Sequence, residues 1–178
     1  IIICLIKSTS IGPSFFIQNR VGMHGKLFKI IKFRSMYVGK NNHESSNITI
    51  LGDSRITSIG RIIRKYKIDE LPSLLNVLLG SMSFVGPRPD VPGYADQLKG
   101  TDRKILSIRP GITGPATLKY ANEESLLSDI DDPEKFNDKV IYPDKVKINI
   151  QYIEKWTFFT DLKIIFKTIF RRDYKNRK

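Results

Sequence analysis

The sequence predicts an α+β fold: one small, mostly helical domain with a short β-hairpin and with amphipathic helices suited to a membrane interface. Three observations support this prediction. The 178 residues are 40% hydrophobic, enough to bury one compact core but not two full-sized ones. Near the N-terminus, two apolar runs flank a turn that contains two glycines, the pattern of a hairpin. Farther along, apolar residues recur every three or four positions, the spacing of a helix face.

Charge and cysteine content exclude several classes of function. The chain carries 30 Lys and Arg residues against 18 Asp and Glu residues, and its net charge of +12 favours an anionic partner such as phosphate, nucleic acid or a lipid surface. One Cys and two His residues cannot complete a four-ligand zinc site, and a single Cys cannot form an internal disulfide. Metal-finger and secreted disulfide-rich proteins are therefore excluded, and a reducing cytosolic face is the expected setting.

The first 13 residues are expected to be the remnant of an N-terminal membrane-associated segment. The chain begins with Ile1 and the apolar run IIICLI instead of Met, so we expect additional sequence upstream. Six apolar residues are far fewer than the roughly 20 of a membrane-spanning helix. The predicted organisation is this remnant at 1–13, followed by a single domain at 14–178.

A hairpin, a loop and an acidic insert are predicted from local composition. The hairpin covers Phe15 to Phe33, with the turn VGMHG between its apolar strands. The polar stretch from Gly39 to Asn47 predicts a mobile loop. The acidic stretch at 122–138 has two Leu residues and little else to bury, so it predicts an exposed helical or looped excursion without a chemical role.

Two helices are predicted to meet at an acidic pair. Apolar residues recur at helical spacing over 56–66, and Pro72 suits the first turn of a second helix at 72–79. Asp69 and Glu70 therefore lie at a helix junction. Adjacent carboxylates repel each other unless a cation intervenes, and Mg²⁺ needs only one or two protein carboxylates. The pair is therefore either a magnesium site or two helix caps, and the spacing alone leaves both open.

Basic residues near strands and in stiff loops are candidates for binding phosphate. Arg88 lies in the segment GPRP, where two prolines limit the conformational entropy lost when a guanidinium pairs with phosphate. Arg109 lies in a similar Pro/Gly loop. An Arg in such a loop is usually solvated or structural, but several of them around an acidic pair predict a site for a phosphate ester and a metal ion. The other basic clusters contain Lys32 and Arg34, and Asp53 with Arg55.

The C-terminal segment at 156–170 combines aromatic and basic residues at helical spacing. Such a helix suits the headgroup boundary of a bilayer, where Lys and Arg side chains are attracted to anionic lipid. A helix packed on the domain core with a solvated basic end is the alternative that the periodicity leaves open. The basic residues are Lys163, Lys167, Arg171 and Arg172.

Four motifs in a fixed order cover nearly the whole chain. They are GPSFFIQNRVGMHGKLFKIIKFRSM, DSRITSIGRIIRKYKIDELPSLLNVLLGSMSFVGPRP, RPGITGPATL and YIEKWTFFTDLKIIFKTI. Together they resemble the catalytic domain of the bacterial sugar transferases, the monotopic phosphoglycosyl transferases. The resemblance implies transfer of a phospho-sugar from a UDP-sugar to polyprenyl phosphate (undecaprenyl phosphate), with release of UMP, through a covalent aspartyl-phosphosugar intermediate. It also implies initiation of surface-glycan synthesis at the cytoplasmic face of the bacterial inner membrane, and an N-terminal re-entrant membrane helix that is truncated here.

The resemblance also assigns roles to individual residues. Asp69 is the expected nucleophile, and Glu70 the expected ligand of the cofactor Mg²⁺. Arg64 and Arg88 match the phosphate-binding positions of the family. The remaining candidates for binding substrate or phosphate are Lys32, Arg34, Asp53 and Arg55, together with Arg109 from its loop.

A non-enzymatic basic module that binds nucleic acid or acidic lipid is the alternative function. Net charge and the aromatic residues near Lys and Arg support it, since phosphate contacts alone would then explain binding. A nucleic-acid groove gains nothing from paired carboxylates beside its cations, whereas metal-assisted phosphoryl transfer does. The enzyme is therefore the preferred prediction, with a UDP-sugar, polyprenyl phosphate and a membrane lipid surface as partners and no nucleic acid. A membrane-docked scaffold with an inactive site is a further alternative, and the sequence leaves the sugar, the polyprenol and the oligomeric state open.

Overall fold

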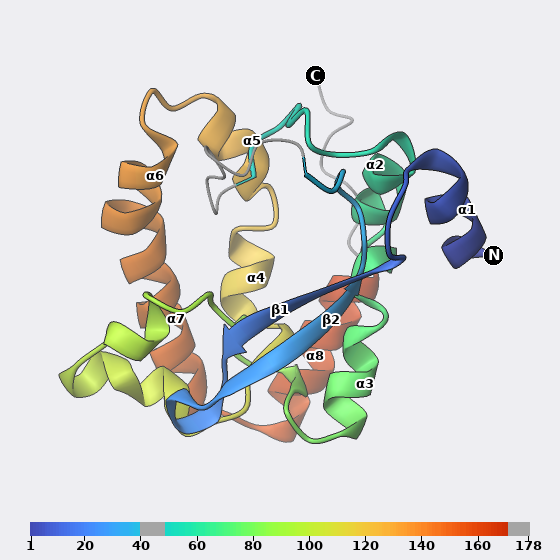
Figure 1. Cartoon of the computed structure of the whole chain (residues 1–178). Helices are drawn as coiled ribbons and strands as arrows, with labels where there is room; N and C mark the ends of the chain where they lie inside the picture. Colours follow the sequence, from blue (N-terminus) through green and yellow to red (C-terminus); the bar gives the residue numbers. More distant parts are fainter. Residues whose placement is uncertain (40–48, 171–178) are drawn as a thin grey trace.

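Helices surround two small β-sheets in the computed structural model of the chain, which describes residues 1–39 and 49–170 (Figure 1). The mixture of helices and short strands confirms the predicted α+β class. Within the described residues, no helix is both long and apolar enough to cross a membrane. Most of the predicted loop, residues 40–47, and the basic residues Arg171 and Arg172 lie outside the described part of the chain.

The predicted hairpin is confirmed and runs diagonally across the molecule (Figure 1). Strand β1 (Phe15–Val21) pairs antiparallel with β2 (Leu27–Phe33), and the 3₁₀ turn η1 (Met23–Gly25) joins them. At the open end of the hairpin the rings of Phe15 and Phe33 stack with their centroids 5.4 Å apart. Two apolar runs and a glycine-containing turn between them were therefore sufficient to locate both strands.

A second sheet, which the sequence analysis did not predict, consists of two short parallel strands. Strand β3 (Ser83–Val85) pairs with β4 (Gly111–Thr113). The backbones approach closely beside this pair, because a Cβ atom on Gly111 would lie 2.2 Å from the backbone nitrogen of Gly86. Only glycine fits at such an approach. The contact places the GPRP loop directly beside the loop that precedes β4.

The two predicted helices and the acidic junction between them are confirmed. Helix α2 (Ser58–Lys65) begins after Thr57, whose Oγ1 accepts a hydrogen bond of 2.9 Å from the backbone N–H of Gly60. The 3₁₀ turn η2 (Ile68–Glu70) contains the acidic pair, and α3 (Ser73–Leu78) follows it. A hydroxyl cap of this kind satisfies one of the unpaired N–H groups at a helix start.

The apolar face of α2 is only partly buried. Ile63 is 3% exposed, but Ile62 and Tyr66 are 52% and 65% exposed. The helix packs through Gly60, where an added Cβ would lie 2.0 Å from the carbonyl oxygen of Ser35. This backbone contact turns the side of α2 that carries Gly60 toward the protein, so Ile62 and Tyr66 face outward.

Helix α3 is joined to strand β2 by side-chain hydrogen bonds. Ser73 Oγ donates to the carbonyl of Ile31 (2.9 Å), and Asn76 Oδ1 accepts from the N–H of Ile31 (3.1 Å). Asn76 Nδ2 also donates to the carbonyl of Lys29 (2.8 Å). Both side chains are almost fully buried. They satisfy backbone groups on the edge of β2 that have no neighbouring strand, which buried polar groups require.

The C-terminal half of the chain supplies most of the core. The buried apolar residues of its larger cluster come from β1, from the segment after the GPRP loop and from the long helix α7. They are Val21, Ala95, Ile105, Leu106 and Val146. The other elements are α1 (Ile2–Thr9), η3 (Ala95–Gln97), η4 (Gly100–Ser107), α4 (Pro115–Lys119), α5 (Glu123–Ser128), α6 (Pro133–Phe136), the π-helical turn η5 (Asn137–Ile141), α7 (Tyr142–Glu154) and α8 (Phe158–Ile169).

The acidic insert is packed against the domain, so its prediction as an exposed excursion is wrong in part. Leu127 of α5 is 1% exposed. Glu123 forms an ion pair with Lys145 of α7 (2.7 Å), and Glu124 forms one with Arg64 of α2. Opposite charges on neighbouring helices therefore hold α5 in place, and this long-range pairing was not visible in the local composition.

Three helices expose a large amount of apolar side chain. Helix α8 buries Ile164 but leaves most of its aromatic residues accessible, and α3 leaves its leucines accessible on the side away from β2. Both helices contact β3, whose Phe84 is also exposed. The exposed apolar residues of these helices, together named the apolar surface, are Ile3 and Leu5 of α1, Leu74, Leu75, Leu78 and Leu79 at α3, and Phe158, Phe159, Leu162, Phe166 and Ile169 of α8.

Replacing Asn76 with Ala is expected to destabilise the fold by roughly 1–3 kcal/mol, because it leaves partly buried N–H and C=O groups of β2 without partners. Urea unfolding of the purified protein measures this change. Leu78→Ala on the same helix is the control: Leu78 is 82% exposed, and such a substitution should change the free energy of unfolding by no more than about 0.5 kcal/mol. Equal effects of the two substitutions would contradict the role of Asn76.

Candidate functional site

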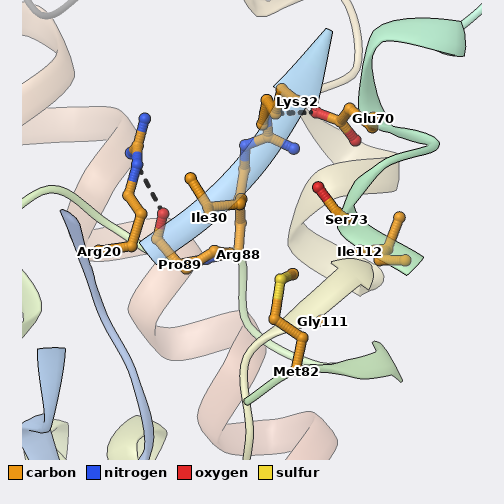
Figure 2. Close-up of a pocket in the computed structure, with 10 residues that line it drawn as sticks. All are labelled: Arg20, Ile30, Lys32, Glu70, Ser73, Met82, Arg88, Pro89, Gly111 and Ile112. Atoms are coloured by element: carbon orange, nitrogen blue, oxygen red, sulfur yellow. Dashed lines mark hydrogen bonds and ion pairs between the residues drawn. The ribbon is translucent and has the colours of Figure 1, made fainter. Parts of the chain in front are cut away.

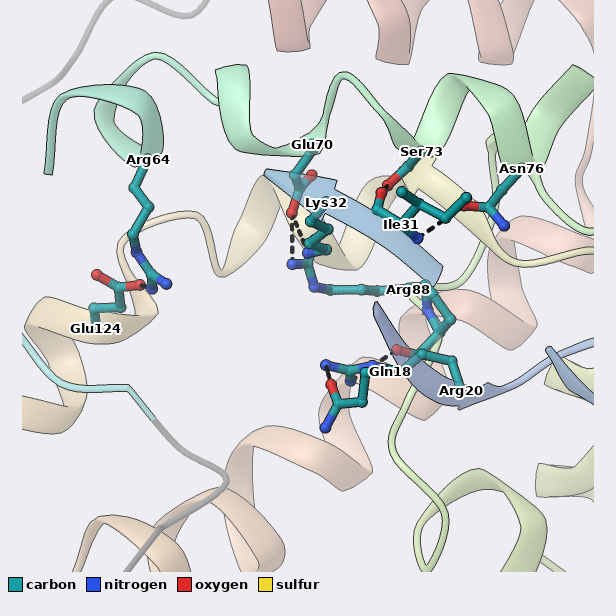
Figure 3. Close-up of polar contacts among 11 residues, drawn as sticks. Gln18, Arg20, Ile31, Lys32, Arg64, Glu70, Ser73, Asn76, Arg88 and Glu124 are labelled. Atoms are coloured by element: carbon teal, nitrogen blue, oxygen red, sulfur yellow. Dashed lines mark hydrogen bonds and ion pairs between the residues drawn. The ribbon is translucent and has the colours of Figure 1, made fainter. Parts of the chain in front are cut away.

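One oxygen of Glu70 is the meeting point of two cations. Glu70 Oε1 accepts hydrogen bonds from Lys32 Nζ (2.9 Å) and Arg88 Nη2 (2.7 Å), and its side chain is only 12% exposed (Figure 3). Burial opposes ionisation of Glu70, but Arg88 and Lys32 more than offset it and hold its pKa well below the usual range. Burial, followed by repulsion from Arg88, lowers the pKa of Lys32 to about 8. The three groups therefore depend on each other for their charge states.

Asp69 has a different environment from its neighbour. It is 8% exposed, and its Oδ1 is buried without a hydrogen-bond partner. Burial, and secondly the charge of Glu70, raise the pKa of Asp69, while Lys32 and Arg64 act in the opposite direction. An unpaired buried carboxylate oxygen is costly, and such a group commonly has a chemical role.

A shallow cleft that opens to solvent lies beside Glu70 (Figure 2). Glu70, Lys32 and Arg88 line it, but Asp69 does not: it lies in the same 3₁₀ turn, next to the cleft. The other lining residues are Arg20, Ile30, Ser73, Met82, Pro89, Gly111 and Ile112. The hairpin, the acidic junction and the GPRP loop therefore meet at one cavity, as the sequence predicted for Lys32, Glu70 and Arg88.

Arg34, a predicted phosphate ligand, lies elsewhere. It is 4% exposed, and its guanidinium donates to the carbonyls of Ile11 and Ser10 and to Ser10 Oγ. These bonds hold the segment after α1 against the end of β2. The structure therefore places Arg34 in a structural clamp and not in the cleft, because the strand ends at Phe33 and the chain turns away.

The four remaining predicted residues do not line the cleft. They are Asp53, Arg55, Arg64 and Arg109. Asp53 and Arg55 pair with each other at 2.6 Å, and this hydrogen-bonded pairing lowers the pKa of Asp53. Arg64 pairs with Glu124, and Figure 3 shows this pair separated from the Glu70 cluster. Arg109 is exposed, and its guanidinium lies on the side of Gly80, at the end of α3.

Arg20 lines the cleft and was missed by the sequence analysis. The hairpin register places Phe16 opposite Lys32 and Arg20 opposite Phe28. Opposite residues share a face of a sheet and side chains alternate along a strand, so Arg20 and Lys32 lie on the same face. Counting residues from the turn would have paired these two cations. Glu124 was also missed, because only the packing of α5 brings it to Arg64.

Replacing Asp69 with Asn is expected to raise the free energy of unfolding at neutral pH in metal-free buffer. The pKa of Asp69 is raised in the folded protein, so its ionised form opposes folding at pH values above that pKa. This increase in the free energy of unfolding should shrink as the pH falls toward 3.8, the usual pKa of Asp. At that pH the Asp69 carboxyl becomes protonated in both the folded and the unfolded chain.

Urea unfolding of both proteins from about pH 7 down to about pH 4 measures this effect. Asp131→Asn is the matched control, since Asp131 is exposed between α5 and α6. It should change stability little at either pH. A gain for Asp69→Asn that stays constant or grows at low pH would contradict the raised pKa.

Comparison with known proteins identifies the family of the chain. A family model described as bacterial sugar transferase matches residues 1–172. The chain is 38% identical over 168 residues to the galactosyl transferase CpsE of Streptococcus agalactiae, covering 89% of this chain and 34% of the relative. It is 37% identical to a UDP-glucose:undecaprenyl-phosphate glucose-1-phosphate transferase of Klebsiella pneumoniae, covering 96% of this chain and 35% of that protein.

A third relative is a UDP-N-acetylgalactosamine-undecaprenyl-phosphate N-acetylgalactosaminephosphotransferase of Aeromonas hydrophila, which is 39% identical over 93% of this chain and 36% of its own length. The chain spans about a third of the length of these relatives. The match to the family model nevertheless covers almost the whole sequence. The chain therefore belongs to the bacterial sugar transferase family.

Proposed function

We propose that the protein transfers a phospho-sugar from a UDP-sugar to a polyprenyl phosphate such as undecaprenyl phosphate, releases UMP and so initiates a surface glycan. The observation that carries this proposal is the pairing of Glu70 with Lys32 and Arg88 at the cleft, next to the unpartnered Oδ1 of Asp69. Cations fixed in this way suit phosphate groups. The names of the Klebsiella and Aeromonas relatives, which act on undecaprenyl phosphate, add support.

Asp69 is the proposed nucleophile. One of its carboxylate oxygens attacks the phosphorus that carries the sugar, a new P–O bond forms, and UMP leaves with the electrons of the broken bond. An oxygen of the polyprenyl phosphate then attacks the same phosphorus and displaces the Asp69 carboxylate. A carboxylate whose pKa is raised is a better nucleophile than an ordinary one, and it has no hydrogen bond at Oδ1 to break.

Arg88 and Lys32 are proposed to reduce the repulsion between the anionic nucleophile and the anionic phosphate. Both cations are held by Glu70, so little side-chain freedom is lost when substrate binds. Arg64 acts on Asp69 only through its charge and is paired with Glu124, so a role for Arg64 in phosphate binding requires it to leave Glu124.

Glu70 and Asp69 also fit the expected magnesium ion. The described residues contain no group of three or more His, Cys, Asp or Glu side chains that could hold a metal by themselves. Mg²⁺ needs only one or two carboxylates, with water and phosphate oxygens completing its shell. Glu70 would hold it, and the unpartnered oxygen of Asp69 lies in the adjacent residue. Bound Mg²⁺ would withdraw charge from the phosphate oxygens and make UMP a better leaving group.

The apolar surface of α1, α3 and α8 is proposed to rest on a lipid bilayer. Exposed aromatic residues on α8 lie beside Lys163 and Lys167, a combination that suits the headgroup region. Polyprenyl phosphate presents its phosphate at that level. This orientation supports a location at the cytoplasmic face of the bacterial inner membrane, and it favours the interfacial alternative for the C-terminal helix.

Incubation with a UDP-sugar alone is expected to release about one UMP per active site before any acceptor is added, because the covalent intermediate accumulates. Asp69→Asn should release none, and Asp131→Asn should behave as the unmodified protein. A panel of UDP-sugars is needed, with UMP measured by rapid quench and chromatography. If UMP appears only after polyprenyl phosphate is added, the covalent route is wrong.

Removal of divalent metal distinguishes the enzyme from a basic binding module. EDTA is expected to abolish UMP release, and Mg²⁺ should restore it, because phosphoryl transfer between anions needs the metal's charge. Binding of nucleic acid or acidic vesicles through surface charge should respond to salt and not to EDTA. A protein that releases no UMP under any condition but binds such partners in EDTA would favour the binding module.

A further inference from the structure

Arg20 is held in the cleft by bonds that leave part of its guanidinium unused. Arg20 Nη2 donates to Gln18 Oε1 (2.7 Å), and Nη1 donates to the carbonyl of Pro89 (3.2 Å). Its Nε is buried and has no hydrogen-bond partner. In Figure 2 and Figure 3, Arg88 lies between Arg20 and Glu70. The Arg20 guanidinium is therefore fixed at the wall of the cleft, and Arg88 lies between it and the Glu70 carboxylate.

Arg20 has no carboxylate in direct contact, although Asp90 and Glu70 attract its charge from farther away. Glu70 pairs with Lys32 and Arg88, but among the described residues no carboxylate lies within ion-pair distance of Arg20. Burial, and secondly repulsion by Arg88, lower the pKa of Arg20 to about 10. A partly buried cation without a counter-ion is unfavourable unless a ligand supplies the missing negative charge.

The composition of the cleft indicates which ligand fits. Lys32, Arg88 and Arg20 line it together, and Glu70 is the carboxylate that lines it with them. Three cations against one lining carboxylate make the wall of the cleft net positive, which favours an anionic group such as the diphosphate of a UDP-sugar or a phosphate monoester. Guanidinium groups bind phosphoryl oxygens in a bidentate manner, and a fork that is already fixed loses little entropy on binding.

We propose that Arg20 is a substrate-binding residue that donates to a phosphoryl oxygen in the cleft, and that Gln18 positions its guanidinium. The inference rests on the proposed function for the identity of the phosphate, which belongs either to the UDP-sugar or to the polyprenyl phosphate. Arg20 and Arg88 then act on the phosphate from neighbouring positions, with Arg88 paired to Glu70 and Arg20 without a direct ion pair.

Binding of inorganic pyrophosphate tests the proposal without catalysis. Isothermal titration calorimetry in metal-free buffer should show binding to the purified protein, and Arg20→Ala should weaken it by about 10-fold or more, as expected for one lost charged hydrogen bond. Arg20→Lys should give an intermediate loss, because it keeps the charge without the fork. Arg103→Ala is the matched control, since Arg103 also donates to backbone carbonyls but is exposed and outside the cleft.

Kinetic measurements identify the phosphate. If Arg20 binds the donor, Arg20→Ala should raise the UDP-sugar concentration needed for half-maximal UMP release. If it binds the acceptor, UMP release should be unchanged and the KM for polyprenyl phosphate should rise. Gln18→Ala should shift the same parameter by a smaller factor, with kcat nearly constant. A purely structural role for Arg20 would lower the melting temperature without changing either KM.

Unchanged pyrophosphate affinity and unchanged KM values in a folded Arg20→Lys protein would overturn the proposal, and this variant is used if Arg20→Ala does not fold. Failure of the proposed function gives a different result. In that case the unmodified protein binds pyrophosphate in an Arg20-dependent way but releases no UMP from any UDP-sugar.

Discussion

The site depends on a single carboxylate oxygen, Glu70 Oε1, that is shared by Lys32 and Arg88. Three segments far apart in the sequence, the hairpin, the acidic turn and the GPRP loop, each contribute one charge to this contact. Lys32 and Glu70 are largely buried, so each would be unfavourable without its partner, whereas Arg88 is 45% exposed and closes the group from the solvent side. The contact therefore joins the three segments at the cleft and sets the charge of its wall.

Backbone geometry determines where Arg88 can lie. The residues on either side of the parallel strand pair β3 and β4 approach so closely that Gly86 and Gly111 have no room for a Cβ atom. The N–H of Gly111 donates to the carbonyl of Pro87 (2.8 Å), and the N–H of Gly86 donates to the carbonyl of Thr113 (2.9 Å). Two prolines then restrict the loop itself. The arginine is thus positioned by glycine contacts and proline rings, and only its final torsion angles need Glu70.

Local patterns in the sequence were enough to predict the hairpin, the two helices and the acidic junction, since each is specified by periodicity, glycine or proline within a short window. They also predicted that Lys32, Glu70 and Arg88 would meet. The parallel strands were not predicted, because three residues per strand show no period. Arg34 and Arg20 illustrate the same limit: both are arginines of the hairpin region, yet one clamps the N-terminal segment and the other lines the cleft. Strand register and chain direction decide between them, and composition contains neither.

Helix α3 has a polar side bound to β2 and an exposed apolar side, and the width of the helix sets the distance between the cleft and the apolar side. Ser73 and Asn76 fasten one side to the strand that carries Lys32, while the leucines of the other side are exposed. A helix with its side chains is about 10 Å across. The cationic wall of the cleft is therefore held roughly one helix diameter from whatever surface the leucines touch, and the hydrogen bonds of Ser73 and Asn76 keep that distance constant.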